Sequence, residues 1–186
     1  MRLLYYKLLL FDIKVSMNLD GLKYIEVPYN GKTYYRLVDA SDNAVIINTP
    51  FLYAPFGIDI VKDTFSVKLE FNNLCNTLQK KFYNLLESID EKNIKFLGCK
   101  KKNYKKTVKK SKNYKDITVK LKTYKKRPIC KVEFENNKIN YLKTIYEVGK
   151  RVKISCDLEL GLIWKIEKGD DFEYGMSLLS NLIIVK

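Results

Sequence analysis

The sequence predicts a mainly β protein: a small antiparallel β-barrel with one central helix and a long basic loop. Short segments in which apolar and polar residues alternate fill both halves of the 186-residue chain, as in strands with one buried face. One stretch in the middle changes to helical spacing, and no strand–helix alternation indicates a parallel sheet. A barrel with a helix across one end accounts for this order, and an unrelated α+β sandwich remains the alternative.

The first half contains strands separated by turns. Residues 23–27 alternate, and residues 32–38 follow after Asn30-Gly31, a strong signal for a tight hairpin. Residues 44–48 form a β-branched run. Residues 65–71 alternate strictly and predict a strand that buries one face.

The middle of the chain predicts one helix, from about residue 74 to residue 92 or a little beyond. Its apolar residues recur every three or four positions, at Leu74, Leu78, Phe82, Leu85 and Ile89. Asn73 is suited to cap the start, and Gly98 is suited to end the helix in a left-handed conformation. We expect the apolar stripe to pack into the core.

Strand patterns return after residue 116. They cover residues 117–121, 129–134, 139–146, 151–160, 162–167 and 174–185. We expect turns at Asn136-Asn137 and at residues 169–171, and a sharp bend at Gly161 between two strands.

We expect a single domain from residue 17 to residue 186, with a flexible basic loop at about residues 99–116. The apolar segment at residues 3–11 is too short to cross a bilayer, and no signal-peptide cleavage site follows it. Residues 1–16 are interpreted either as an extra strand or as an extension before a start at Met17. No membrane partner is expected.

The positive charge is concentrated in one segment. The chain has 35 Lys and Arg against 21 Asp and Glu, which gives a net charge of +14. Residues 95–131 hold 16 of these bases and a single acid, Asp116, so the rest of the chain is close to neutral. Residues 100–115 have nine Lys in sixteen positions and almost no apolar side chains, which predicts a mobile loop. A charge of this size predicts an anionic partner.

The composition argues against an enzyme and against a metal site. The chain has no His, which removes the commonest general base and the commonest zinc ligand. The four Cys lie at least 24 residues apart and are interpreted as reduced thiols. Acidic groups such as Asp170-Asp171 lie at turns and strand ends, where acids are common, and do not indicate a two-metal cluster. We expect no catalytic residue, no metal and no cofactor.

Lysines interleaved with tyrosines predict a nucleic-acid-binding surface, because ammonium groups meet phosphates while rings offer faces to bases. The pattern Asn-Tyr-Lys occurs at residues 103–105 and 113–115, and Tyr-Lys-Lys at residues 124–126. The candidate binding residues are Lys120, Lys122, Tyr124, Lys125, Lys126, Arg127, Lys131, Tyr104, Tyr114, Lys105 and Lys106. Two plainer interpretations stay open: a solvated strand face for the lysines after residue 119, and a low-complexity insertion for the basic loop.

Three aromatic residues outside this stretch have other expected roles. Trp164, the only Trp, is either a core residue or a platform for a base. Phe51 and Phe56 are expected to be packing residues near a turn.

Three passages resemble a known family. The first is residues 49–58, Thr-Pro-Phe-Leu-Tyr-Ala-Pro-Phe-Gly-Ile. In the second, residues 117–134, a Lys-bearing strand is followed by a basic turn, Pro128 and another alternating strand. The third is Gly-Leu-Ile-Trp at residues 161–164 followed by Tyr-Gly-Met-Ser at residues 174–177. In this order around a central helix, they resemble the OB-fold single-stranded DNA-binding proteins of nucleocytoplasmic large DNA viruses, which are similar to replication single-strand-binding proteins of podophages.

The resemblance covers about residues 20–186 and implies an OB-fold-like barrel. The implied function is to bind and protect single-stranded DNA, largely without sequence preference, during viral DNA replication, recombination or repair. The implied partners are single-stranded DNA, replication proteins and further copies of the chain. The implied location is intracellular, at the viral replication site in the host cytoplasm, or in the virion.

The chain departs from the family pattern at two places. Residues 100–115 look like an insertion, and Leu121 stands where an aromatic residue is expected, which puts base stacking on that strand in doubt. The alternatives are a protein that binds duplex DNA or RNA, and a virion structural protein that condenses nucleic acid.

Overall fold

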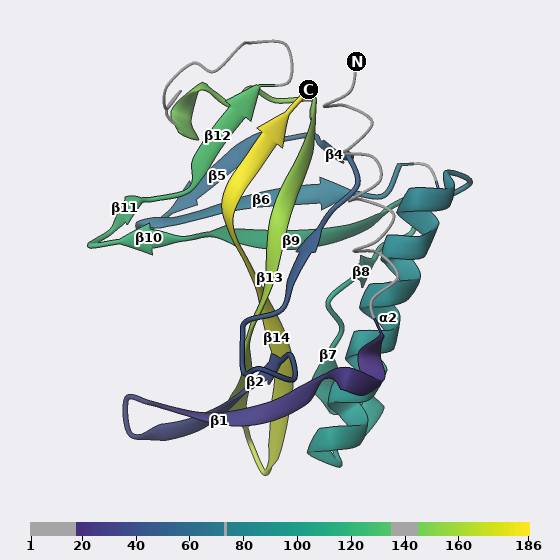
Figure 1. Cartoon of the computed structure of the whole chain (residues 1–186), viewed down its shortest axis with the longest axis vertical. Coiled ribbons are helices and arrows are strands. Elements are labelled where there is room, and N and C mark those ends of the chain that lie inside the picture. The colour runs from purple at the N-terminus through teal and green to yellow at the C-terminus, as the bar shows by residue number, and fades with distance from the viewer. Residues whose placement is uncertain (1–17, 73, 135–144) are drawn as a thin grey trace.

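The computed structural model describes residues 18–72, 74–134 and 145–186, and it is mainly β with one long helix (Figure 1). The strands of the first half are β1 (Lys23–Tyr29), β2 (Lys32–Val38), β3 (Ile46–Asn48), β4 (Leu52–Ala54), β5 (Ile58–Val61) and β6 (Thr64–Glu70). After helix α2 (Thr77–Leu97) come β7 (Tyr104–Lys105), β8 (Lys109–Lys110), β9 (Lys115–Leu121), β10 (Thr123–Tyr124), β11 (Arg127–Pro128), β12 (Lys131–Phe134), β13 (Val152–Lys168) and β14 (Asp171–Val185). Short 3-10 helices are η1 (Leu19–Gly21), η2 (Lys101–Asn103) and η3 (Ile145–Glu147).

Some predictions concern residues outside the ranges that the structure describes. Those for residues 1–16, Met17, Asn73 and Asn136-Asn137, and for most of the strand at residues 139–146, lie outside the described residues. The end of that predicted strand is wrong, because Ile145–Glu147 forms the 3-10 helix η3.

Most strands pair with the long hairpin of β13 and β14. β13 pairs with β2, β3 and β4, and β14 pairs with β7, β9 and β12. Because β4 also pairs with β6, and β6 with β9, the pairings run in a ring from β13 through β4, β6 and β9 to β14 and back. The mainly β prediction is confirmed.

Most of the described strand pairs are antiparallel, as predicted, but three pairs are parallel. β14 runs parallel to β7, β9 and β12. Parallel neighbours need long connections, and β14 is separated from each of these strands by the whole of β13. The alternation in sequence does not distinguish the two directions.

The predicted alternation of the central strands is confirmed. In β6 and just after it, the odd-numbered residues from 65 to 71 are buried, and in β9 the residues Ile117, Val119 and Leu121 are buried. The residues between them, such as Lys68 and Lys120, therefore lie on the outer face of the sheet. Leu121 is a core residue and carries no aromatic ring that could stack on a base.

Gly161 lies inside one continuous strand instead of at the predicted bend between two strands. The pairing of β13 with β14 is irregular between Leu160 and Ile163, which indicates a β-bulge. A Cβ atom on Gly161 would lie 2.8 Å from the carbonyl oxygen of Ser177, so this close approach requires glycine.

The structure bears on the expected roles of two aromatic residues, Trp164 and Phe56. Trp164 is opposite Gly175, and a Cβ atom on Gly175 would collide with its ring, so the indole fills the space that glycine leaves. This contact supports the structural role of Trp164. Phe56 is 59% exposed, so the expectation that it packs near a turn is wrong.

Helix α2 is confirmed, although it begins and ends later than predicted. The buried residues of its predicted stripe are Phe82, Leu85 and Ile89. Asn76 caps the start by accepting hydrogen bonds from two backbone N–H groups of the first turn, and Gly98 ends the helix at φ 59°. The last turn continues to Leu97, and in it the ring of Phe96 stacks on Tyr24 with centroids 3.7 Å apart. None of the described helices is long and apolar enough to cross a membrane.

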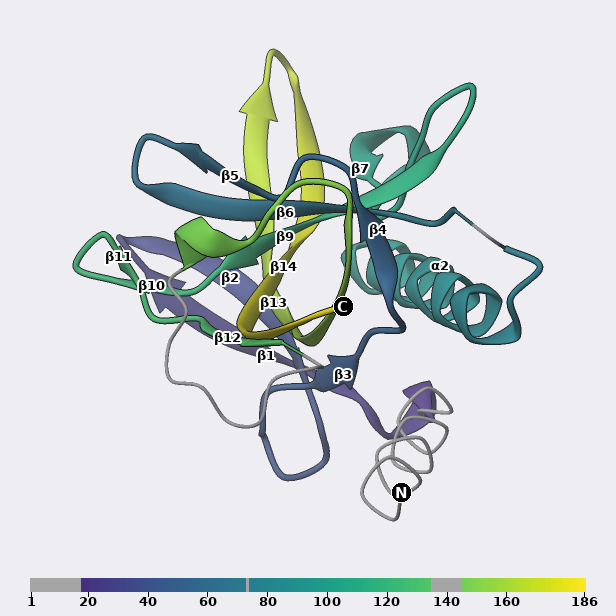
Figure 2. The ribbon, with the colours of Figure 1, turned by 90° about the horizontal axis from the view of Figure 1, so that it is seen from above.

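Residues 99–116, here called the basic segment, are more structured than predicted. The segment contains η2, β7 and β8, of which β7 pairs with β14 and β8 with β9. Tyr104, Thr107 and Val108 are buried, so the expectation of a loop without core contacts is wrong. These three side chains anchor the segment to the core, and its lysines are exposed apart from the half-buried Lys115. Figure 2 shows α2 on one side of the molecule and the β10–β11 hairpin on the other.

Candidate nucleic-acid interface

A row of neighbouring residues crosses the outer face of the sheet. The strand register places Lys120 of β9 between Ser66 of β6 and Leu179 of β14. Leu179 is in turn opposite Glu159 of β13. Directly paired residues share one face of a sheet, so this face carries a cation, an apolar residue and an acid side by side.

An open groove of about 670 Å³ follows this row. Its apolar lining includes Phe65 and Leu179. Its cationic lining consists of Arg36, Lys120 and Lys122. A surface that combines apolar area with cations can accept a base and its phosphate together.

Two cations in the groove are held in different ways. Lys122 forms an ion pair with the mostly buried Glu159. The Nε atom of Arg36 is buried and has no hydrogen-bond partner among the described residues. A buried donor without a partner costs about 1–3 kcal/mol.

Two hairpin turns meet at the mouth of the groove. Both central residues have positive φ in each turn: Lys62 (46°) and Asp63 (64°) before β6, and Lys125 (47°) and Lys126 (66°) between β10 and β11. The ammonium group of Lys126 lies 3.1 Å from the carboxylate of Asp63. Such turns usually contain Asn-Gly, because a side chain in the left-handed region costs about 1–2 kcal/mol. The Lys125-Lys126 turn thus holds two cations at a cost in stability.

Tyr124 stands beside this turn and is 64% exposed. The ammonium group of Lys125 lies 5.5 Å from the centroid of its ring, within the range of a cation–π contact. The structure brings six predicted residues together around the groove and its mouth: Lys120, Lys122, Tyr124, Lys125, Lys126 and Arg127. Lys131 is exposed on β12, outside the groove lining.

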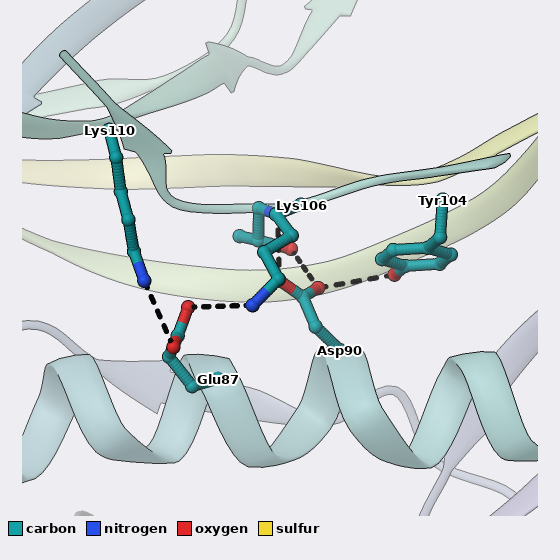
Figure 3. Close-up of polar contacts among 6 residues, drawn as sticks. Glu87, Asp90, Tyr104, Lys106 and Lys110 are labelled. Carbon is teal, nitrogen blue, oxygen red and sulfur yellow. Dashed lines mark hydrogen bonds and ion pairs between the residues drawn. The ribbon is translucent and has the colours of Figure 1, made fainter. Parts of the chain in front are cut away.

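Two other predicted lysines lie away from the groove and are paired with acids. Lys106, like Lys110, reaches Glu87 of α2, at 3.4 and 3.3 Å respectively (Figure 3). Burial disfavours the Glu87 carboxylate, but the hydrogen bond from Lys110 and the charges of both lysines outweigh it and lower its pKa. Lys105 lies 3.9 Å from Glu173 of β14. Lys105 and Lys106 are therefore partly neutralised by the protein itself.

Tyr104 is not available to stack on a base, so that prediction is wrong. Its ring is buried, and its hydroxyl donates to Asp90 at 3.2 Å. Asp90 is fully buried on α2 and also accepts hydrogen bonds from the backbone N–H (2.8 Å) and the hydroxyl (2.6 Å) of Thr107. Burial raises the pKa of Asp90 in spite of these bonds. This network fixes the basic segment on the helix (Figure 3).

Sequence reasoning missed two cations of the outer face. Lys68 could have been found, because the alternation of residues 65–71 places it on the outer face of its strand. Arg36 gives no such signal, because residues 32–38 mix tyrosines and polar residues on both faces.

The two buried cysteines do not add a reactive site to this surface. Cys130 and Cys156 are buried, and burial raises the pKa of each to about 12, so both thiols stay protonated. In the described part of the chain, no group of three His, Cys, Asp or Glu side chains is placed to hold a metal ion.

The comparison with known proteins reveals similarity at the level of structure. No protein family and no curated protein sequence matches the chain. The chain is similar to gp2.5, a single-stranded DNA-binding protein encoded by bacteriophage T7, with 9% identity, a TM-score of 0.55 and coverage of 75% of this chain and 90% of that one. Two structures of the single-stranded DNA-binding protein from bacteriophage Enc34 match with 13% and 14% identity and TM-scores of 0.45 and 0.44. They cover 88% of this chain and 93% and 89% of their own.

At 9% identity, the similarity to gp2.5 is one of fold. It confirms the predicted likeness to the fold of a phage single-stranded DNA-binding protein. Because gp2.5 is a phage protein, the link to large DNA viruses remains a prediction.

Replacing Asp90 with Ala should lower the free energy of unfolding by roughly 3 kcal/mol or more. The donors of Tyr104 and Thr107 would be left unpaired, at about 1–3 kcal/mol for each buried group. Because the folded-state pKa of Asp90 is raised, its contribution is greatest below the unfolded pKa and falls as the pH rises through the folded value. Urea unfolding should therefore show a larger effect at pH 4 than at pH 7. An effect no larger than that of the exposed Glu91→Ala, or one that grows with pH, would contradict this account.

Changing Lys125-Lys126 to Asn-Gly should stabilise the fold by about 1–3 kcal/mol and weaken binding to nucleic acid. The strain of two left-handed side chains disappears together with two cations. Lys62-Asp63 to Asn-Gly relieves similar strain and is the control for stability alone, because Asp63 lines the groove and pairs with Lys126. Thermal melts should show stabilisation of both variants, and fluorescence titration should show that the Lys125-Lys126 variant binds more weakly than the unmodified protein. Affinity equal to that of the unmodified protein would show that the Lys125-Lys126 turn takes no part in binding.

Proposed function

We propose that this protein binds and protects single-stranded DNA, largely without sequence preference. The observation that carries this proposal is the groove between β6 and β13, which is lined by cations and apolar side chains and reaches Thr123 of β10, the strand that also carries the exposed Tyr124. The similarity of fold to a phage single-stranded DNA-binding protein supports it.

The proposed mechanism is sequestration, and no bond is broken. Lys120 and Arg36 in the groove and the Lys125-Lys126 turn at its mouth take the positions of counterions along the phosphates. The ring of Tyr124 stacks on a base, and stacking tolerates any base because every base has a π face.

Single strands suit this surface better than duplex DNA does. Reading of the major groove usually requires a helix that presents the contacting side chains. Here the cations of the groove lie on strands and tight turns, and α2 packs one face into the core. An exposed aromatic ring can stack only on a base whose face is free, as in a single strand.

We further infer a role in viral DNA replication, recombination or repair, with replication proteins and further copies of the chain as partners. The corresponding location is the viral replication site in the host cytoplasm, or the virion. The fold similarity to a phage-encoded protein supports this role.

Fluorescence titration with single-stranded DNA, duplex DNA and single-stranded RNA at several salt concentrations tests the proposal. If about four to six phosphates are neutralised, log K should fall against log salt with a slope of about −3 to −4. Single-stranded DNA should bind more tightly than duplex DNA throughout the salt range. Equal or tighter binding of duplex DNA would refute the proposal, and a preference for RNA would favour the RNA-binding alternative.

Tyr124→Ala should weaken binding of single-stranded DNA roughly tenfold or more, because stacking on one base contributes about 1–3 kcal/mol. The melting temperature should barely change, since the ring is 64% exposed. Tyr29→Ala is the matched control, because Tyr29 is a comparably exposed tyrosine at the β1–β2 turn. A large loss of stability with unchanged affinity would assign Tyr124 to the core instead.

A further inference from the structure

A second aromatic cluster lies on the same outer face as the groove, nearer the far end of β6 and β9. The ammonium group of Lys68 lies 4.6 Å from the ring centroid of Tyr114 and 5.9 Å from that of Phe56. Phe56 is 59% and Tyr114 is 42% exposed. Both rings are therefore available to a ligand while one cation holds them together.

Lys68 is itself fixed in place by Asp116. Its ammonium group lies 3.4 Å from the Asp116 carboxylate, which is almost fully buried. Burial disfavours the Lys68 cation, but the charge of Asp116 and the contact with Tyr114 outweigh it and raise its pKa. Lys68 therefore serves to hold the two rings, and further cations must attract the phosphates.

These cations come from the turn between β8 and β9. Its backbone is closed by hydrogen bonds from Ser111 to the carbonyl oxygen of Tyr114, at 2.9 Å from N–H and 3.1 Å from the hydroxyl. An open hollow of about 280 Å³ lies beside Tyr114, with Lys112 and Lys115 in its lining. The apolar part of its lining is Phe71 and Leu74. A nucleobase could enter this hollow while its phosphate meets the exposed Lys112, since the ammonium group of Lys115 already lies 4.7 Å from the centroid of the Tyr83 ring on α2.

The strand register connects this cluster to the groove. Lys120 is opposite Ser66, and Lys68 is opposite Thr118, two positions further along the same face. Lys68 and Lys120 are therefore diagonal neighbours on the outer face, and such neighbours are about 7–8 Å apart. From Tyr114 to Tyr124 the surface extends roughly 30 Å at about 3.3 Å per residue.

We propose that Phe56, Lys68 and Tyr114 form a second subsite for nucleobases, so that one single strand runs from the β10–β11 hairpin across β6 and β9 to the β8–β9 turn. This inference rests on the proposed function. It specifies how far the same site extends and which path the strand takes over the surface. The span corresponds to about nine nucleotides at the ~3.4 Å rise of a stacked strand, within the range of about 4–16 nucleotides known for one OB fold.

The test compares oligothymidine strands of six and sixteen nucleotides, one shorter and one longer than the proposed span. Tyr114→Ala and Phe56→Ala should each weaken binding of the longer strand about tenfold, as expected for loss of one stacked base. Binding of the shorter strand, which the groove and Tyr124 can hold alone, should change less than about threefold. Tyr124→Ala should weaken binding of both strands.

Phe172→Ala is the matched control for the loss of an exposed ring under a lysine. Lys165 lies 3.7 Å from the centroid of Phe172, near the tip of the β13–β14 hairpin, which Figure 1 places away from β6 and β9. The control should bind both strands like the unmodified protein.

The outcomes separate this inference from the proposed function. If Tyr124→Ala weakens binding while Tyr114→Ala and Phe56→Ala bind the longer strand normally, the second subsite is refuted and the proposed function stands. If the unmodified protein does not bind either strand, the proposed function itself fails. An equal loss for Phe172→Ala would also refute the subsite, because the effect would not be local. Melting temperatures identify a variant that fails to fold, and Lys68→Gln then tests the same cluster without deleting a ring.

Discussion

The pairing of β13 with β14 is the contact on which the rest of the sheet depends. Six further strands pair directly with one or the other of these two. The parallel pairing of β14 with β9 sets Lys120 beside Leu179 and thus forms the floor and one wall of the groove. Glycine at position 161 lets the two strands approach closely enough for this arrangement.

The basic segment shows how a strongly charged stretch can be held in a fold. Asp90 presents a buried carboxylate that accepts three hydrogen bonds from Tyr104 and Thr107, and Glu87, one turn earlier on α2, pairs with two lysines. The ion pairs neutralise part of the positive charge beside the helix. Together with the hydrogen bonds they also hold the β8–β9 turn, with Tyr114, at the outer face of β6, where it is available for binding.

The sequence predicted the parts of the fold that depend on local pattern. Alternation located β6 and β9 and the face that each buries, and a change of period located α2 with Gly98 at its end. It did not predict the parallel pairings, because alternation is the same in either direction. It also missed the burial of Tyr104, because nothing near that residue in sequence indicates that Asp90, on a helix before it, needs a donor. Of the candidate site, the lysines and Tyr124 around residues 120–127 were found together, whereas Arg36 and Phe56 come from distant strands and turns.

The most direct test of the central claim is to map where a bound strand lies on the protein. Titration of isotope-labelled protein with oligothymidine, followed by amide chemical shifts, reports this residue by residue. We expect the large shifts to fall on residues 62–68 and 118–127 and near Arg36, along the outer face of β6 and β9. Shifts confined to the β1–β2 hairpin, to α2 or to the tip of the β13–β14 hairpin, with residues 118–127 unchanged, would contradict it.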